Sequence, residues 1–375
     1  MMRKLLSFLM IWLLLPCAAL GEDTARLDDT LADIFRRYHT TGAVVAVGKG
    51  EELVYHFDYG WADKKSQVPV TSGTAFKSAS VSKLISAIRV MQLMEEGRLS
   101  LDSPIGDTLG YEVSHPGRPF TPVTLRMCMS HTSAIHGSYT AGKTLRQLLN
   151  DSHWETWQPG CRYRYSNLGA GVMGTLMETI TGQDVNTCVD EGVFQPLGID
   201  AAYRVWLLDT PTDAALRYNG EGRLARSRSF YASEPYDPQA GPEAHYDLVI
   251  GDVWIRGDDL CRLGMMLCQG GTLEGVTLLQ PETVAEMTAS QQGQGGITAD
   301  SPYGLCVHRV DSLLPGRMVY GHQGQSDGIV CNLYWEKESG FVFAMMTNGC
   351  STGMDNYICT LSRRAFAAAW AVIGE

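Results

Sequence analysis

Residues 76–97 read FKSASVSKLISAIRVMQLMEEG, and the hydrophobic period changes within this stretch. Up to Ser80 the residues are typical of a strand followed by a turn. Beyond Ser80 the apolar side chains recur at helical spacing on one stripe, namely at Leu84, Ala87, Ile88 and Met91. Gly97 stops the pattern. The sequence therefore predicts a helix from Ser80 to about Glu96 that is entered directly from a strand and a turn.

Strand patterns lie near both ends of the chain. Runs of alternating, β-branched or aromatic residues predict strands at 43–48, 52–59, 329–336 and 340–348. Gly60 is expected to end the second strand, and residues 354–373 predict a long closing helix. The middle of the chain carries helical signals, such as 175–180 and 258–268, and loops, including an irregular excursion over 209–247.

This order predicts an α/β fold with an antiparallel sheet built from both chain ends and flanked by helices. The sheet region covers about 40–79 and 300–375, and a mostly helical domain of about 84–300 is inserted between the two parts. A cleft between sheet and insert is a natural place for a functional site.

Composition and charge exclude several classes of protein. The 375 residues are 45% hydrophobic and 19% charged, which is ordinary for a globular protein. The net charge is −11 and no basic stripe is visible, so nucleic-acid binding is not expected. Small molecules or peptides are the expected binding partners, and the oligomeric state is left open.

The first 21 residues are typical of a secretory signal peptide. Arg3 and Lys4 precede an apolar run, and Ala19-Leu20-Gly21 offers a cleavage site after small residues. An uncleaved anchor and lipidation at Cys17 are alternatives. Residues 22–375 would then form one exported domain, in the periplasm or outside the cell, with no further membrane-spanning segment.

Nine cysteines remain after removal of the leader, so at least one thiol is unpaired unless it bonds to another chain. No C-x-x-C pair is present, so no zinc site, metal or cofactor is predicted. Several cysteines lie in apolar runs and are expected in the core.

The segment Ser80-Val81-Ser82-Lys83 can carry nucleophilic chemistry. A serine hydroxyl needs a base to take its proton, and Lys83 lies one helical turn along on the same face. Burial would lower the lysine pKa toward the range of a general base. By itself the pattern is frequent, and a capping serine with a solvated lysine explains it equally well.

Two further segments strengthen the catalytic interpretation. In Tyr165-Ser166-Asn167, the phenol can relay a proton and the amide can hold a substrate carbonyl. In His322-Gln323-Gly324, the glycine would let a substrate lie against a strand edge, and the next backbone N–H can point at an oxyanion. A core aromatic and a satisfied core histidine are the structural alternatives for Tyr165 and His322.

Taken together, these motifs resemble the serine β-lactamase and penicillin-binding protein superfamily. The likeness is greatest to the branch that holds class C β-lactamases, D-Ala-D-Ala carboxypeptidases and related esterases. It runs from about residue 40 to 350. The linking segments that match are Tyr59-Gly60-Trp61-Ala62-Asp63, Met129-Ser130-His131-Thr132-Ser133, Pro196-Leu197-Gly198 and residues 321–328.

The resemblance implies a role for each matching residue. Ser80 would be the acylated nucleophile and Lys83 its base or proton partner. Tyr165 would shuttle a proton to the leaving group, and Asn167 would orient the substrate amide. The backbone N–H groups of Ser80 and Gln325 would form the oxyanion hole.

Two positions depart from the pattern of the relatives. Many relatives have lysine where this chain has His322, and the carboxypeptidase relatives usually have threonine where it has Gln323. A neutral imidazole would pull less on Tyr165 and on a substrate carboxylate, so the two departures weaken the case for a true β-lactamase and leave peptidase, esterase and amidase activities open. If the charge of His322 helps to hold a substrate carboxylate, affinity for anionic substrates should fall as the pH rises through the imidazole pKa, which is near 6.5 when unperturbed.

Competing motifs are less convincing. Residues 324–328 and 349–353 both fit G-x-S-x-G, but a strand is expected after the first, and no histidine follows the second. His131 and His136 are expected to be structural. The sequence thus predicts an exported serine hydrolase that acts through an acyl-enzyme on amide or ester bonds, most plausibly D-amino-acid peptides of the cell wall or β-lactams. The alternatives are an esterase or amidase of the same fold and a slowly deacylating penicillin-binding protein.

Overall fold

The computed structural model describes residues 23–150, 153–291, 303–355 and 357–374. The expected leader at 1–21 lies outside this part. Within the described residues, no helix is long and apolar enough to cross a membrane.

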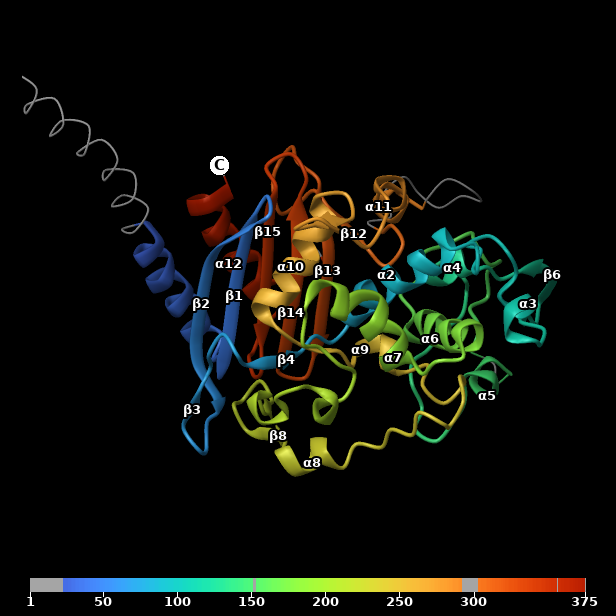
Figure 1. Ribbon diagram of the computed structural model, residues 1–375, viewed down its shortest axis with the longest axis horizontal. Helices are drawn as coiled ribbons and strands as arrows, with labels where there is room; N and C mark the ends of the chain where they lie inside the picture. The colour runs from blue at the N-terminus through green and yellow to red at the C-terminus, as the bar shows by residue number, and fades with distance from the viewer. Residues whose placement is uncertain (1–22, 151–152, 292–302, 356, 375) are drawn as a thin grey trace, which may run out of the picture.

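A seven-stranded antiparallel sheet forms the centre of the molecule, and its strands come from both ends of the chain (Figure 1). The order across the sheet is β12-β13-β14-β15-β1-β2-β3. The strands are β1 (Gly42–Lys49), β2 (Glu52–Asp63), β3 (Val68–Pro69), β12 (His308–Val310), β13 (Val319–Ser326), β14 (Ile329–Glu336) and β15 (Phe341–Thr347). The predicted fold class, an antiparallel sheet flanked by helices, is confirmed.

Helices cover both faces of this sheet. On one face, α10 (Gly257–Cys268) packs along β1, β14 and β15. On the other face lie α12 (Thr360–Ala369) and the helical residues 23–37 (Figure 1). Two separate apolar clusters fill the two interfaces. The cluster under α10 continues without a break into the helical region.

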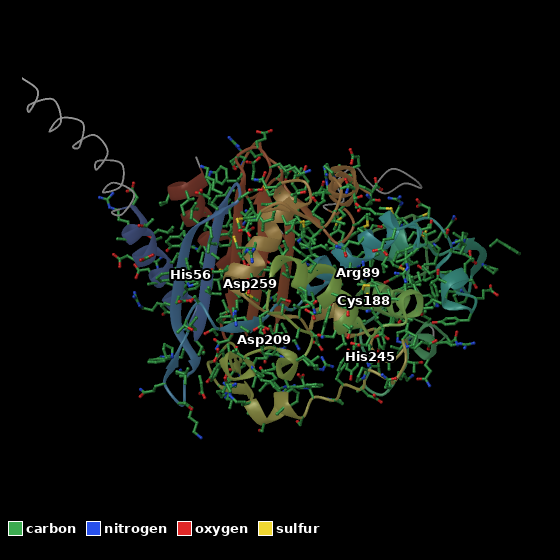
Figure 2. The ribbon with its side chains drawn as sticks, viewed as in Figure 1. His56, Arg89, Cys188, Asp209, His245 and Asp259 are labelled. Atoms are coloured by element: carbon green, nitrogen blue, oxygen red, sulfur yellow. The ribbon has the colours of Figure 1, made fainter. Side chains whose placement is uncertain are left out.

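α10 approaches the sheet closely because glycines stand where the two surfaces meet. A β-carbon added at Gly48 would lie 2.4 Å from Met265 Sδ, and one added at Gly264 would lie 2.6 Å from Leu333 Cδ1. At the start of α10, His56 of β2, which is labelled in Figure 2, contacts Asp258 at 2.6 Å. The hydrogen bonds of His56 to Asp258 and Asp58 raise its pKa to about 10, so this bridge stays charged at neutral pH.

The helical side is organised around α2 (Val81–Glu95), which packs against α6 (Asn167–Thr181), α9 (Leu248–Gly251) and β13. The predicted helix 80–96 is confirmed, with Ser80 at its N-cap. Its burial extends beyond the predicted stripe to nearly the whole circumference. The other α-helices are α3 (Ile105–Leu109), α4 (Leu125–Met129), α5 (Leu145–Asn150), α7 (Val185–Val189), α8 (Arg228–Ala232) and α11 (Pro281–Thr288).

Short elements complete the chain. Two-stranded sheets are formed by β4 (Ala75–Lys77) with β9 (Trp254–Arg256), β5 (Ser114–His115) with β6 (Arg118–Pro122), β7 (Arg217–Tyr218) with β8 (Leu224–Arg226), and β10 (Thr272–Leu273) with β11 (Val276–Thr277). Single turns of 3₁₀- or π-helix are η1 (Asp190–Phe194), η2 (Gln195–Leu197), η3 (Val205–Leu207), η4 (Pro211–Asp213) and η5 (Trp370–Gly374). The excursion over 209–247 contains only such short elements, as the sequence predicts.

Three predicted boundaries were wrong. β2 continues through Gly60 to Asp63, because Gly60 adopts φ +69° and pairs with Gly42 without ending the strand. The segment 354–373 is not one helix. It begins with the hairpin of β16 (Met354–Asp355) and β17 (Ile358–Cys359), in which Tyr357 has a left-handed φ of +66° that no α-helix contains.

The third wrong boundary is the start of the helix predicted over 175–180. α6 begins at Asn167, eight residues earlier. Its first half is rich in glycine, which obscures the helical pattern in the sequence. Gly171 is required there because an added β-carbon would lie 2.9 Å from the carbonyl oxygen of Tyr246.

The cysteines behave as small core residues. All nine described cysteines are free thiols, and seven of them are buried, at positions 128, 188, 261, 306, 331, 350 and 359. The prediction that they belong to the core is confirmed for these seven.

The contact between α10 and the sheet leads to a testable expectation. Gly264→Val should destabilise the fold by about 2 kcal/mol, because the added side chain meets Leu333 and Val342 in a closely packed interface. The matched control is Gly353→Ala, where the added carbon meets only Thr360 Oγ1 at 3.9 Å and the change should stay within about 0.5 kcal/mol. Urea unfolding measures both, and equal midpoints for the two variants would contradict this packing.

Candidate active site

The turn that leads into α2 presents Ser80 toward the sheet. Ala79, the residue before it, has φ +46°, a left-handed conformation that is strained for a residue with a β-carbon. Ser80 is the N-cap of α2, yet its side chain makes no capping hydrogen bond. Its hydroxyl is therefore free for another partner.

That partner is Lys83. Its Nζ donates to Ser80 Oγ at 3.1 Å and to the carbonyl oxygen of Ile250 at 2.6 Å. The side chain is fully buried, and no carboxylate among the described residues pairs with it. Burial lowers the lysine pKa from 10.5 to about 7, so a large share of Lys83 is neutral at neutral pH. A neutral amine at this distance can accept the proton of the serine hydroxyl.

Tyr165 lies beside this pair. Lys83 Nζ is 5.2 Å from the centre of the Tyr165 ring, and Tyr165 as a whole residue is 38% exposed. Burial of the phenol raises its pKa, and an interaction with Ser80 acts in the opposite direction. Tyr165 is therefore a neutral phenol in the resting protein and can donate a hydrogen bond to a leaving group.

Asn167 is the first residue of α6 and is placed by the cap of that helix. Ser166 Oγ accepts from the backbone N–H of Gly169 at 2.9 Å and fixes the helix start. The Asn167 amide nitrogen donates to Ser138 Oγ at 3.2 Å, and its oxygen has no partner although it is buried. A buried acceptor without a partner is suited to receive a substrate N–H.

β13 lies against the nucleophile turn at Gly324. A β-carbon at this position would lie 2.3 Å from Ser78 O and 2.9 Å from the backbone nitrogen of Ser80. The expectation that this glycine makes room for a substrate is therefore corrected, since it makes room for the backbone before Ser80. Gln325 follows Gly324 directly and is exposed. Because Gly324 lies against the backbone of Ser80, the backbone nitrogens of Ser80 and Gln325 belong to adjacent segments.

Gln323 is not part of this cluster. Its Oε1 accepts from the backbone N–H of Cys359 at 2.8 Å, and its amide donates to Tyr357 O at 3.4 Å. Because side chains alternate along a strand, Gln323 faces the opposite side of the sheet from Gly324. Its predicted contact with substrate through the side chain does not occur in this structure.

His322 is in the cluster but does not carry the charge expected of it. The side chain is completely buried, and Nδ1 and Nε2 bond to Gln323 O at 2.8 Å and to Tyr303 Oη at 2.7 Å. Burial, together with the nearby His308 and Lys83, lowers its pKa well below 6.5. A charged His322 that holds a substrate carboxylate is therefore not what the structure indicates, because burial and the nearby His308 and Lys83 disfavour the imidazolium.

Sequence reasoning missed several residues that surround Tyr165. His131 is 1% exposed, and its ring centre is 4.2 Å from that of Tyr165. Tyr303 is buried and His308 is half-buried beside His322, with ring centres 5.9 Å and 4.4 Å from that of His322. Only His131 lies in a segment that the family resemblance singles out, and no local spacing signals the other two.

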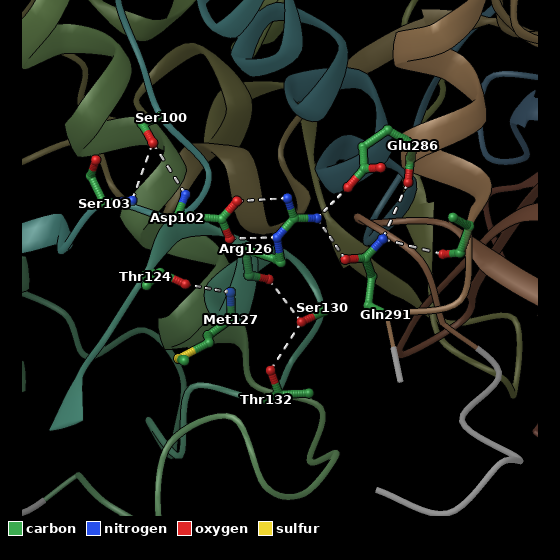
Figure 3. A network of polar contacts seen from close by, with 11 residues as sticks. Ser100, Asp102, Ser103, Thr124, Arg126, Met127, Ser130, Thr132, Glu286 and Gln291 are labelled. Atoms are coloured by element: carbon green, nitrogen blue, oxygen red, sulfur yellow. Dashed lines mark hydrogen bonds and ion pairs between the residues drawn. The ribbon is translucent and has the colours of Figure 1, made fainter. Parts of the chain in front are cut away.

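The loop that carries His131 is held by a polar network around Arg126 of α4 (Figure 3). The guanidinium bonds to both carboxylate oxygens of Asp102 at 2.6 and 2.8 Å, to Gln291 Oε1 at 2.9 Å and to Glu286 of α11. Ser130 Oγ donates to the Arg126 carbonyl at 2.7 Å, directly before His131. This network joins three distant segments and fixes where the loop starts.

The competing candidates lie elsewhere. Ser326 ends β13 and β14 follows it, as expected for a strand rather than a helix. Ser351 is exposed. His136 pairs with Glu155 at 2.9 Å and is half exposed, in keeping with its predicted structural role. Within the described ranges, no group of three or more His, Cys, Asp or Glu residues is arranged to hold a metal ion.

Comparison with known proteins agrees with this geometry. A family model described as Beta-lactamase matches residues 27–367. Penicillin-binding protein 4 from Amycolatopsis lactamdurans is 29% identical over 348 residues, which is 87% of this chain and 86% of that protein. Esterase EstB from Burkholderia gladioli is 31% identical over 198 residues, covering 47% of this chain and 50% of the esterase.

A solved structure shows the same fold. The D-amino acid amidase from Ochrobactrum anthropi SV3, in complex with L-phenylalanine amide, superposes with a TM-score of 0.71 at 19% identity and covers 95% of this chain and 99% of the amidase. The family match extends over nearly the whole described chain, and Ser80 and Lys83 lie in hydrogen-bond contact within it. The chain therefore belongs to the Beta-lactamase family and is a serine hydrolase.

Proposed function

We propose that this serine hydrolase is exported and cleaves esters or amides of D-amino acids and related small acyl groups through an acyl-enzyme on Ser80. The observation that carries the proposal is the 3.1 Å hydrogen bond between the fully buried Lys83 amine and the Ser80 hydroxyl. The names of an esterase and a D-amino acid amidase among the similar proteins support the substrate class. The leader expected at residues 1–21 supports export.

The proposed reaction uses groups that lie near Ser80. Ser80 Oγ attacks the substrate carbonyl carbon while its proton passes to neutral Lys83, and the developing oxyanion accepts from the backbone N–H groups of Ser80 and Gln325. The bond to the leaving group then breaks, Tyr165 delivers a proton to the departing oxygen or nitrogen, and the Lys83 ammonium returns the serine proton to the phenol. Water hydrolyses the ester on Ser80 by the reverse path.

The surroundings of Tyr165 favour an uncharged leaving group. The groups that shift the pKa of the phenols of Tyr163, Tyr165 and Tyr303 are a serine hydroxyl, a thiol and other phenols, and the amine of Lys83 lies 5.2 Å from the centre of the Tyr165 ring. No arginine is among them, and His322 is neutral. A leaving group that carries a carboxylate would lose water and gain only the partly neutral Lys83 in return. We therefore favour neutral esters and amides over peptides that end in a free D-alanine and over β-lactams.

Ser80→Ala should lower turnover by about 10⁴- to 10⁶-fold, because the nucleophile is lost while the fold is kept. Ser351→Ala, which removes the serine of the second G-x-S-x-G segment, is the matched control and should keep full activity. Hydrolysis of a chromogenic ester measures both, with circular dichroism as a check on folding. Loss of activity in the Ser351 variant alone would show that the nucleophile is assigned wrongly.

The pH dependence should report Lys83. Because the neutral amine is the active form, kcat/KM should rise with pH through a midpoint of about 7 and reach a plateau above it. Initial rates with a neutral ester from pH 5 to 9 measure this. A flat profile, or a midpoint near the ordinary lysine value of 10.5, would contradict the role of Lys83 as the base.

Leaving-group charge gives a further test. A phenyl ester should react with a kcat/KM about tenfold or more above that of its 3-carboxyphenyl counterpart with the same acyl group. This ratio should not change between pH 5.5 and 8, because His322 remains neutral throughout. If the carboxylated ester is favoured at pH 5.5 and this preference is lost at pH 8, then His322 is a titrating carboxylate partner and the preference for neutral groups is wrong.

A further inference from the structure

A buried phenol connects two of the histidines that surround the reacting groups. Tyr303 Oη lies 3.2 Å from Nε2 of His131 and 2.7 Å from Nε2 of His322. All three side chains are at most 1% exposed. They come from the loop after α4, the segment before β12 and β13, so the tertiary fold alone brings them together.

The remaining partners decide which ring nitrogens carry protons. The backbone N–H of Ser166 donates to His131 Nδ1 at 3.2 Å, so this nitrogen is an acceptor and the ring proton lies on Nε2. His322 Nδ1 faces the carbonyl oxygen of Gln323 at 2.8 Å. A carbonyl only accepts, so Nδ1 of His322 carries the proton and Nε2 is the acceptor.

With these protons, every hydrogen bond in the chain has one donor and one acceptor. His131 Nε2–H donates to Tyr303 Oη, Tyr303 O–H donates to His322 Nε2, and His322 Nδ1–H donates to the Gln323 carbonyl. Both imidazoles are neutral in this arrangement. An additional proton on either ring would leave two donors facing each other at one of these contacts.

The chain of hydrogen bonds reaches the reacting groups through the ring of His131. That ring packs on Tyr165 with centres 4.2 Å apart, whereas His322 lies 6.4 Å from Tyr165. A shift of His131 would therefore move the phenol that faces Ser80. A displacement of about 1 Å in such a group can cost on the order of 100-fold in rate.

The electrostatic surroundings of Lys83 also depend on these rings. The groups that face it are Ser80 and Ile250 O, the thiol of Cys306 with a pKa raised to about 12, the phenol of Tyr165, and the imidazoles of His131, His308 and His322. None of these groups is an anion at neutral pH, and none of the three imidazoles carries a charge. Lys83 is thus the only one of these groups that carries a positive charge when it is protonated at neutral pH.

We propose that Tyr303 is a positioning residue, whose hydroxyl holds His131 and His322 in two complementary neutral tautomers and thereby fixes Tyr165 beside Ser80 and Lys83. The effect of Tyr303 on the reaction rate rests on the proposed function. The tautomers themselves do not depend on which substrate the protein uses.

The direct test is nitrogen NMR of the histidine rings in the wild-type protein at pH 7, with signals assigned by single histidine substitutions. The expected result is a proton on Nε2 of His131 and on Nδ1 of His322, with the other nitrogen of each ring unprotonated. An imidazolium at either position, or the opposite tautomer at His322, would overturn the proposal. The NMR result does not depend on the Ser80→Ala experiment, so a failure of this proposal can be distinguished from a failure of the proposed function.

The kinetic test is Tyr303→Phe, which removes one oxygen atom from the centre of the chain. We expect kcat to fall about 10- to 100-fold with little change in KM. We also expect an added ionisation in the acid limb of kcat/KM between pH 5 and 6.5, because His322 Nε2 is then free to take a proton. Tyr203→Phe is the matched control, since Tyr203 is equally buried and its hydroxyl bonds to Ser86 of α2 at 2.6 Å.

The control removes a buried phenol hydroxyl that bonds to α2 and is not part of the histidine chain. If both variants lose the same activity and keep the wild-type pH profile, Tyr303 is a structural residue only and the proposal fails. If Tyr303→Phe does not fold, the tautomers measured in the wild type still decide it.

Discussion

The burial of the Lys83 amine is the constraint on which the rest of the site depends. An ammonium group in a place without water or a carboxylate is costly, and the protein meets this cost by favouring the neutral form. Its contacts in the described structure, Ser80 Oγ and the carbonyl of Ile250, hold the amine in one orientation. The same burial that would destabilise a charged lysine turns it into a base for the serine beside it.

A second constraint is steric. The strand β13 can lie against the nucleophile turn only because Gly324 has no side chain, since any β-carbon would overlap the backbone between Ser78 and Ser80. This approach brings the segments of Ser80 and Gln325 side by side, as the proposed oxyanion site requires. The left-handed Ala79 next to it shows that some backbone strain accompanies the arrangement.

The neutral character of the site separates this chain from the expectation based on its relatives. A cation at position 322 would attract a substrate carboxylate, but the buried His322 bonds to a phenol and a carbonyl and stays uncharged. The imidazoles of His131, His308 and His322 are neutral and add no positive charge near Lys83. The proposed preference for uncharged leaving groups follows from this neutral character.

The sequence by itself determined the fold class and the helix that starts at Ser80, because these depend on local periodicity. The i, i+3 spacing of Ser80 and Lys83, together with the family resemblance, pointed to the proposed nucleophile and its base. The sequence did not determine the protonation state or the hydrogen-bond partners of the side chains in the site. The Lys83 contact to Ile250 spans 167 residues, and that of His131 to Tyr303 spans 172. Gln323 faces away from the site because side chains alternate along β13. The closing helix begins only after Tyr357, because that residue has a left-handed backbone conformation. Only the tertiary structure decided these features, because desolvation and hydrogen-bond partners arise from segments that are distant in sequence and meet only in the folded chain.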